Sequence, residues 1–161
     1  MGMLGIMSDQ QLLISSLIEH SGKYHGNTEI IDCNSDGEIN RTNYKDTLLR
    51  VKKLSQSLLN LDINIGDRVG TLAWSNLRHF ELYYGVSGIG AVCHTINPRL
   101  FKEQIIFIIN DAKDKILFVD IEFLDLIKDI SSELKTLETI VILGKKNTLD
   151  DEVKINQKVL T

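Results

Sequence analysis

An alternation of short apolar segments and helical patterns runs from Arg68 to Leu143, and it constrains the fold more than any other feature. The apolar segments carry few charges, which is typical of strands buried on both faces of a parallel sheet. Helical patterns separate them, as right-handed crossover connections require. We therefore predict an α/β fold with an open, mostly parallel sheet and flanking helices. The expected strands span 68–73, 91–96, 115–120 and 139–143, and the expected helices span 77–89, 100–112 and 123–134.

Ahead of this alternation, the sequence predicts two helices and a small N-terminal hairpin. Ser8 opens a pattern with capping-box spacing, so we expect a helix from there to about Tyr24. A turn cluster at 34–37 then separates two short strand patterns. These strands are expected at 28–33 and 38–42. The second helix has one apolar stripe at spacings of three and four residues, formed by Tyr44, Leu48, Val51, Leu54, Leu58 and Leu61.

The composition is that of one globular domain. The chain has 161 residues, of which 43% are apolar and 25% charged, and these values exclude disordered and fibrous classes. A formal net charge of −4 argues against a nucleic-acid partner, because the charge opposes approach to phosphate. We expect one domain over residues 1–143, followed by a polar tail over residues 144–161.

Cysteine usage and hydropathy indicate where the protein resides. Cys33 and Cys93 lie far apart and match no zinc or disulfide spacing, which is typical of a reducing, cytoplasmic setting. The N-terminus lacks the charged region of a signal peptide. The longest nearly uncharged run, 82–96, is too short to span a bilayer. We therefore expect a cytoplasmic protein with no transmembrane segment.

Motifs that carry chemistry are scarce. The glycines of 85–90 close a helix instead of opening one, so helix-to-sheet packing and a helix stop explain them better than nucleotide binding does. No Walker loop and no nucleophile elbow occurs. His79 shares its helix with Arg78 and Glu81, which we interpret as a solvated face. His94 lies in an apolar strand, where a hydrogen-bonded core imidazole is favoured over a catalytic one. The residues alone predict no active site and no metal site.

One stretch is more specific than these patterns. Its motifs are Gly66-Asp67-Arg68-Val69, Thr71-Leu72-Ala73-Trp74, Arg78-His79-Phe80-Glu81-Leu82-Tyr83-Tyr84 and a run from Gly88 to Leu100 that includes Gly90 and Asn97-Pro98-Arg99. Arg41-Thr42-Asn43-Tyr44 precedes them at the entry to the long helix. In this order the motifs closely resemble the long-chain fatty-acid–CoA ligases of the AMP-binding, adenylate-forming superfamily. The resemblance runs from about residue 3 to residue 143.

This resemblance implies an acid–thiol ligase that works in two steps. ATP and a fatty acid give an acyl-adenylate and pyrophosphate, with Mg²⁺ on the phosphates, and the thiol of CoA then displaces AMP. The family carries its phosphate loop, its Mg²⁺-binding glutamate and the lysine of its small C-terminal domain downstream of the matched region. Nothing of that kind occurs before Thr161. We therefore expect an incomplete N-terminal part of the large domain of such an enzyme, inactive alone and binding no cofactor, whereas the intact enzyme would use fatty acid, ATP, Mg²⁺ and CoA.

No catalytic residue can be carried over from the family, so the predicted site residues are of two kinds. His94, Asn97 and Arg99 lie at the carboxyl end of a strand, where open α/β sheets bind ligands. They are expected either to border the acyl or adenylate pocket or to anchor the loop. Structural roles are expected for the helix stripe at Tyr44, for close packing at Gly88 and Gly90, and for Gly66, Asp67, Arg68, Trp74 and Pro98.

Two other interpretations stay open at this level. In the first, the chain is a stand-alone, non-catalytic α/β module that binds an acyl group or a partner protein. In the second, it is a decayed gene remnant. The resemblance also implies a homodimer through the N-terminal segment. An incomplete sheet leaves an unpaired strand edge and an apolar face exposed, so we expect the isolated chain to oligomerise or aggregate.

Overall fold

The computed structural model describes residues 11–34, 37–144 and 155–161. Its central sheet has five parallel strands in the order β4-β3-β5-β6-β7, which confirms the predicted open parallel sheet. The strands are β3 (Arg68–Leu72), β4 (Val92–Thr95), β5 (Ile116–Asp120), β6 (Thr139–Leu143) and β7 (Lys158–Leu160). The last of these was not predicted, because it lies in the segment that we expected to be a polar tail.

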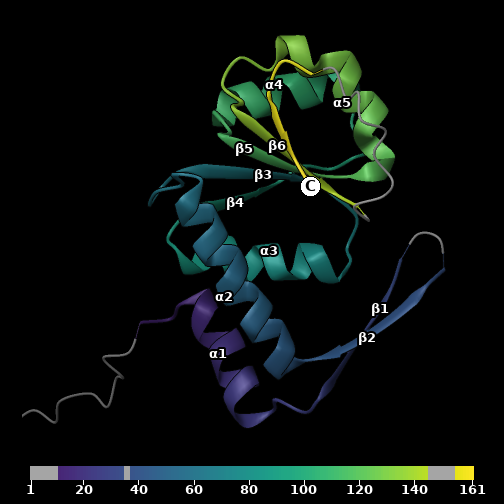
Figure 1. Ribbon diagram of the computed structural model, residues 1–161. Helices are drawn as coiled ribbons and strands as arrows, with labels where there is room; N and C mark the ends of the chain where they lie inside the picture. Colours follow the sequence, from purple (N-terminus) through teal and green to yellow (C-terminus); the bar gives the residue numbers. More distant parts are fainter. Residues whose placement is uncertain (1–10, 35–36, 145–154) are drawn as a thin grey trace, which may run out of the picture.

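Helices cover both faces of this sheet (Figure 1). Two of them, α4 and α5, lie on one face, and α2 and α3 lie on the other. Successive residues of β5 alternate between two cores: Leu117 packs toward α4 and α5, whereas Ile116 and Phe118 pack toward α2 and α3. All five residues of β5 are buried, as expected for a strand covered on both sides. The helices are α2 (Tyr44–Asn60), α3 (Leu77–Gly88), α4 (Lys102–Ala112) and α5 (Leu124–Ile130).

The helix predicted over 123–134 is shorter and is broken into pieces. A 3₁₀ turn at Ile121–Phe123 precedes α5, and a second one at Ser131–Glu133 follows it. Within the part of the chain that the structure describes, no helix is both long and apolar enough to cross a membrane.

A helix at the N-terminal side, α1 (Ile14–Tyr24), packs against α2 and α3. It begins later than predicted, because residues 11–13 are not helical, and Ser8 lies outside the described residues. The helix buries Ile18 and leaves Leu17 exposed, and Leu13 just before the helix is exposed as well. The predicted stripe of α2 is confirmed: Val51 and Leu58 are buried, and its other members are at least partly buried.

The predicted hairpin is also confirmed. Strands β1 (Glu29–Cys33) and β2 (Ile39–Asn43) pair antiparallel, and Gly37 supplies the positive φ that the turn needs. The hairpin projects away from the central sheet, and β2 leads directly into α2 (Figure 1). The Asn43 side chain caps α2 by accepting a hydrogen bond of 2.8 Å from the backbone N–H of Asp46.

Candidate functional site

A cluster of polar side chains covers the carboxyl ends of β3 and β5, which are neighbours at the centre of the sheet. Asp120, the last residue of β5, is buried and accepts hydrogen bonds from the backbone N–H of Trp74 at 2.7 Å and from Nδ2 of Asn76 at 3.4 Å. These bonds fix the loop that leaves β3. Open α/β sheets bind ligands at this edge, which makes the cluster the candidate functional site.

His79 holds the same loop from the other side. Its Nδ1 lies 3.2 Å from the carbonyl oxygen of Trp74, and its Nε2 lies 3.0 Å from the hydroxyl of Thr71 on β3. Because a carbonyl only accepts, Nδ1 carries the proton in the neutral imidazole, and Nε2 accepts from the Thr71 hydroxyl. The imidazole also stacks on Tyr83, with ring centroids 4.8 Å apart. Both ring nitrogens of His79 are therefore engaged in positioning.

The side chain of Trp74 is fixed as firmly as its backbone. The indole N–H donates to Oε2 of Glu122 at 2.7 Å, and the ring lies 5.2 Å from the Phe123 ring in a tilted contact. The residue nevertheless stays 37% exposed. Trp74, predicted to be structural, thus presents a rigidly held aromatic surface at the edge where the fold places its ligands.

Burial sets the protonation preferences of the two groups that clamp Trp74. Desolvation lowers the pKa of His79, and this is only partly opposed by the Trp74 carbonyl and by Asp120. Desolvation raises the pKa of Asp120, against the stabilising hydrogen bonds from Trp74 and Asn76. Both shifts favour the neutral form of the group. The hydrogen bonds to Trp74 and Asn76 are therefore made by groups whose charged forms are disfavoured by burial.

The solvated face predicted around His79 is wrong for two of its three residues. His79 is 6% exposed and Glu81 is 5% exposed, because α3 lies between the sheet and α2. The Glu81 carboxylate is compensated by Arg50 of α2, whose guanidinium donates Nε and Nη2 to its two oxygens, the latter at 3.0 Å. Sequence reasoning missed this pair, because its partners are 31 positions apart on different helices.

The motif Gly66-Asp67-Arg68 forms the entry to β3. Gly66 has a φ of 84°, and Asp67 accepts a 2.9 Å hydrogen bond from the backbone N–H of Asn64. That bond, together with Lys115, holds the pKa of Asp67 below its ordinary value. Arg68 donates to the carbonyl oxygens of Ala112 at 2.6 Å and of Lys113 at 3.3 Å, which are the last residue and the C-cap of α4. The motif therefore caps the end of α4 and joins it to the start of the sheet.

The glycines near the end of α3 differ in the space around them. Gly90 has a φ of 78°, in keeping with the predicted helix stop, and an added Cβ there would lie 3.1 Å from the Ile65 side chain, in keeping with the predicted close packing. A Cβ added at Gly88 would meet nothing closer than 3.7 Å, so Gly88 does not permit close packing. That role belongs to Gly85, where an added Cβ would lie 2.7 Å from the Leu54 side chain of α2. Tyr44 is the first residue of α2.

His94 forms a hydrogen bond with a buried side chain of the fold. Its Nδ1 lies 2.8 Å from Oδ2 and 3.0 Å from Oδ1 of Asp114, which is fully buried. Burial raises the pKa of Asp114, although the His94 contact acts against this. This geometry is that of a hydrogen-bonded imidazole that fastens the edge strand β4. Whether His94 also borders a substrate pocket stays a prediction.

The other two predicted pocket residues lie in the loop between β4 and α4. Oδ1 of Asn97 accepts a 3.0 Å hydrogen bond from the backbone N–H of Arg99, and both residues are exposed. Pro98 lies between them and is partly buried. This turn anchors the loop locally, and its predicted contact with an acyl or adenylate group stays a prediction.

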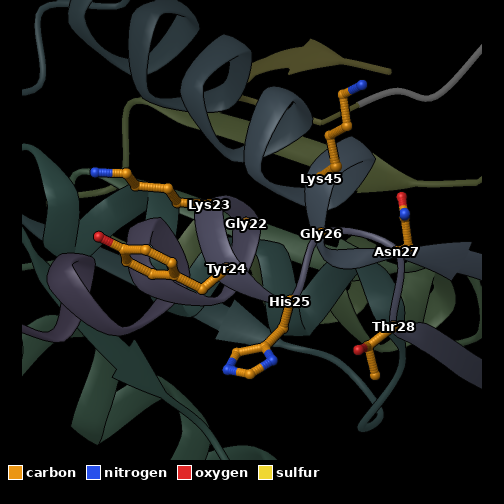
Figure 2. A pocket seen from close by; sticks show the side chains of 8 residues that line it. All are labelled: Gly22, Lys23, Tyr24, His25, Gly26, Asn27, Thr28 and Lys45. Atoms are coloured by element: carbon orange, nitrogen blue, oxygen red, sulfur yellow. The ribbon is translucent and has the colours of Figure 1, made fainter.

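Neither of two clefts on the described surface includes His94, Asn97 or Arg99. The larger, of about 610 Å³, lies where α1 runs into β1 and is lined by residues 22–28 and Lys45. Figure 2 shows that its side chains diverge: Lys23 and Tyr24 point away from Lys45, and His25 turns in a third direction. No set of polar groups converges there on a ligand. The smaller cleft lies between the hairpin and α3 and includes Asn76 and His79 of the candidate site.

The described residues do not form a metal site from their own side chains alone. No group of three or more His, Cys, Asp and Glu side chains comes together in the ranges 11–34, 37–144 and 155–161. The acidic pair nearest the candidate site, Asp120 and Glu122, is occupied by Trp74. No step that requires a metal can be assigned to these residues.

Comparison with known proteins identifies the family. Residues 18–160 match the family described as AMP-binding enzyme. The chain is 48% identical over 145 residues to the 3-methylmercaptopropionyl-CoA ligase of Ruegeria lacuscaerulensis, covering 90% of this chain and 27% of that protein. It is 44% identical to the medium-chain-fatty-acid–CoA ligase of Ectopseudomonas oleovorans, covering 91% of this chain and 27% of the relative. This chain therefore belongs to the family of AMP-binding enzymes.

Two further comparisons agree with this assignment. The long-chain-fatty-acid–CoA ligase of Thermus thermophilus is 38% identical, with 87% of this chain and 26% of that protein covered. The crystal structure of an anthranilate–CoA ligase in complex with anthranoyl-AMP has the same fold over 86% of this chain and 27% of the other, with a TM-score of 0.76 at 24% identity. The chain spans about a quarter of the length of the curated relatives that it matches. The resemblance to acyl-CoA ligases is confirmed.

Proposed function

We propose that this chain is part of an ATP-dependent acyl-CoA ligase. The reaction joins a carboxylic acid to ATP, giving an acyl-adenylate and pyrophosphate, and then joins the acyl group to the thiol of CoA with release of AMP. The observation that carries the proposal is the match of residues 18–160 to the AMP-binding enzymes, together with relatives named as acyl-CoA ligases at 38–48% identity.

The acid is proposed to be aliphatic. The three relatives compared above are named for methylmercaptopropionate, a medium-chain and a long-chain fatty acid, and these acids share an unbranched carbon chain next to the carboxylate. A long-chain acid is one member of this class, and the choice among chain lengths belongs to residues that line the acyl tunnel. The free cysteines Cys33 and Cys93 support a cytoplasmic location for the ligase.

These 161 residues are proposed to supply structure to the ligase and to be inactive alone. At the candidate site, the nitrogens of His79 and the carboxylate of Asp120 are already bonded to Thr71 and to the Trp74 loop. Burial raises the pKa of the Cys93 thiol to about 11, so it is not a nucleophile at neutral pH. The phosphate loop, the Mg²⁺-binding glutamate and the catalytic lysine would come from other parts of the ligase polypeptide.

Acid-dependent release of pyrophosphate tests the proposal. The purified chain is compared with a chimera in which this chain replaces the matched region of the Ruegeria lacuscaerulensis ligase. We expect the chain alone to release no pyrophosphate from ATP with any aliphatic acid, and the chimera to form both acyl-adenylate and acyl-CoA. A chain that formed acyl-adenylate unaided would overturn its proposed inactivity. A folded but inactive chimera would instead argue for the alternative, a non-catalytic module, and binding of fatty acid without ATP would then identify it.

A further inference from the structure

The strand order of the central sheet defines one point at which its connections diverge. Strand β3 comes first along the chain, β4 pairs with it on one side, and β5 pairs with it on the other. The helix α3, which follows β3, and the helix α5, which follows β5, lie on opposite faces of the sheet (Figure 1). Open α/β sheets bind their ligands at the carboxyl edge beside such a switch point. In this protein the switch point lies between the ends of β3 and β5.

Trp74 lies at this switch point, because it follows β3 and contacts the segment that follows β5. Its indole N–H donates to Oε2 of Glu122, and its ring centroid lies 5.2 Å from that of Phe123. Its backbone N–H donates to Asp120, and its carbonyl oxygen lies 3.2 Å from Nδ1 of His79. These four contacts hold the residue, which remains 37% exposed. An aromatic surface that is fixed in advance loses little conformational freedom when a ligand binds to it.

The chemistry of this surface favours a planar, neutral ring as its ligand. The hydrogen-bonding groups of Trp74 are already engaged, so the exposed part of the indole offers a ligand its π surface. A planar ring gains stacking energy from one flat aromatic surface. A flexible acyl chain instead needs an enclosed apolar pocket, and neither of the two clefts on the described surface includes Trp74. The Glu122 carboxylate beside the ring repels an anionic group but not a neutral base.

We propose that Trp74 is a stacking platform for the adenine ring of a nucleotide substrate of the ligase. This inference rests on the proposed function, in which ATP and CoA both carry that ring. The adenine lies against the exposed part of the indole, and the phosphates extend away from the Glu122 carboxylate. Trp74 makes and breaks no bond in the reaction. It is a binding residue that sets the affinity for the nucleotide.

Two substitutions that differ chiefly in aromatic character test the platform. Trp74→Phe and Trp74→Leu both remove the N–H that Glu122 accepts, so any structural loss from that bond is common to them. Trp74→Phe alone keeps an aromatic face. Both are made in the chimera that carries this chain in place of the matched region of the Ruegeria lacuscaerulensis ligase. Titration calorimetry then measures the dissociation constants of AMP, of CoA and of a fatty acid, and this readout does not require activity.

We expect Trp74→Leu to weaken the binding of one adenine ligand by roughly tenfold, within the range that base stacking contributes, and Trp74→Phe to weaken it by less than roughly threefold. A loss for CoA with AMP unchanged assigns the platform to CoA, and the reverse assigns it to ATP. Pantetheine and ribose 5-phosphate lack the adenine ring and should bind equally to all variants. Tyr24→Leu is the matched control: it removes an aromatic side chain that is 62% exposed on α1, and both nucleotides should bind as before.

Two results would overturn the platform. Equal nucleotide affinities in Trp74→Phe and Trp74→Leu would show that the aromatic ring is not used. Weaker binding of both AMP and CoA, or of the fatty acid, in Trp74→Leu would indicate a distorted site or an acyl contact. An active chimera with the first result refutes the platform and leaves the ligase proposal intact. Ring-dependent binding of AMP or CoA to an inactive chimera supports the platform and argues against the ligase proposal.

Discussion

Nδ1 of His94 lies 2.8 Å from Oδ2 of Asp114, and the carboxylate reaches it across Gly70 of the strand between them. The contact joins the edge strand β4 to the segment that leads into β5. It depends on the missing side chain at Gly70, where an added Cβ would lie 2.9 Å from Oδ2 of Asp114 and 2.8 Å from the Leu117 side chain. One glycine of β3 thus makes room for a hydrogen bond between β4 and the segment before β5.

Gly70→Ala is expected to destabilise the fold by about 1–3 kcal/mol, the usual cost of overpacking a core. The new methyl group forces either the Asp114 carboxylate or Leu117 to move, and it weakens the bond to His94. Urea unfolding followed by circular dichroism measures the change. Gly88→Ala is the control, because that position has space, and we expect it to be neutral or to stabilise by up to about 1 kcal/mol. Equal changes in the free energy of unfolding for the two variants would contradict the proposed tight packing at Gly70.

The Arg50–Glu81 ion pair should contribute more to the free energy of unfolding than the exposed Arg41–Glu29 ion pair. Arg50→Met leaves the buried Glu81 carboxylate without its guanidinium, and we expect a loss of about 1–3 kcal/mol in the free energy of unfolding. Arg41→Met removes an exposed ion pair with Glu29 and is expected to cost within about 0.5 kcal/mol. Chemical denaturation of both variants makes the comparison. A loss at Arg41 as large as that at Arg50 would contradict the difference in burial.

The elements that sequence reasoning predicted well are those whose burial leaves a local pattern. The stripe of α2 follows from its helical periodicity, and strands β3 and β5 follow from apolar runs whose only charges, Arg68 and Asp120, stand at the strand ends. Strand β7 left no such signal: it has three residues, and pairing with β6 defines it. Its existence depends on a partner that is distant in the sequence.

The candidate site was harder to predict for a related reason. His79 looked solvated beside Arg78, because a helix that carries charges is usually exposed on that side. Its imidazole is instead packed against Thr71 of β3 and the Trp74 loop, contacts that no local pattern records. Asp120 carried one usable signal, its position at the carboxyl end of a buried strand. The hydrogen bond from the Trp74 N–H to Asp120 joins residues 46 positions apart and became visible only in the fold.

The stability of the protein should depend on the titration of His79. Desolvation lowers its pKa from the ordinary 6.5, so at mildly acidic pH the unfolded chain binds a proton that the folded chain does not. The free energy of unfolding therefore falls as the pH is lowered through 6.5 toward the pKa of the folded state. His79→Gln removes the imidazole that binds this proton. We therefore expect the free energy of unfolding to fall less between pH 7.5 and 5.5 in the variant than in the original chain.

The raised pKa values of Asp114 and Asp120 act in the opposite direction. Each folded carboxyl holds a proton above its ordinary pKa of 3.8, so these groups add stability as the pH falls toward that value. The contribution of Asp114 is common to the original chain and to His79→Gln, whereas Asp120 interacts with His79 and is affected by the substitution. The difference between the two unfolding curves against pH thus reports His79 together with its interaction with Asp120, and parallel curves would contradict the desolvation of His79.

The clamp on Trp74 can be followed directly, because Trp74 is the only tryptophan of the chain. Asp120→Ala leaves the Trp74 N–H without its acceptor, and we expect a loss of about 1–3 kcal/mol together with a red shift of the indole emission. Asp120→Asn keeps an oxygen at that place, and its emission should stay close to that of the original chain. Glu122→Gln also keeps an acceptor for the indole and serves as a second control. Unchanged emission in Asp120→Ala would show that Phe123 and Glu122 hold the indole ring without the hydrogen bond from the Trp74 backbone to Asp120. The contact of His79 with the Trp74 carbonyl would then be what positions the backbone of the loop.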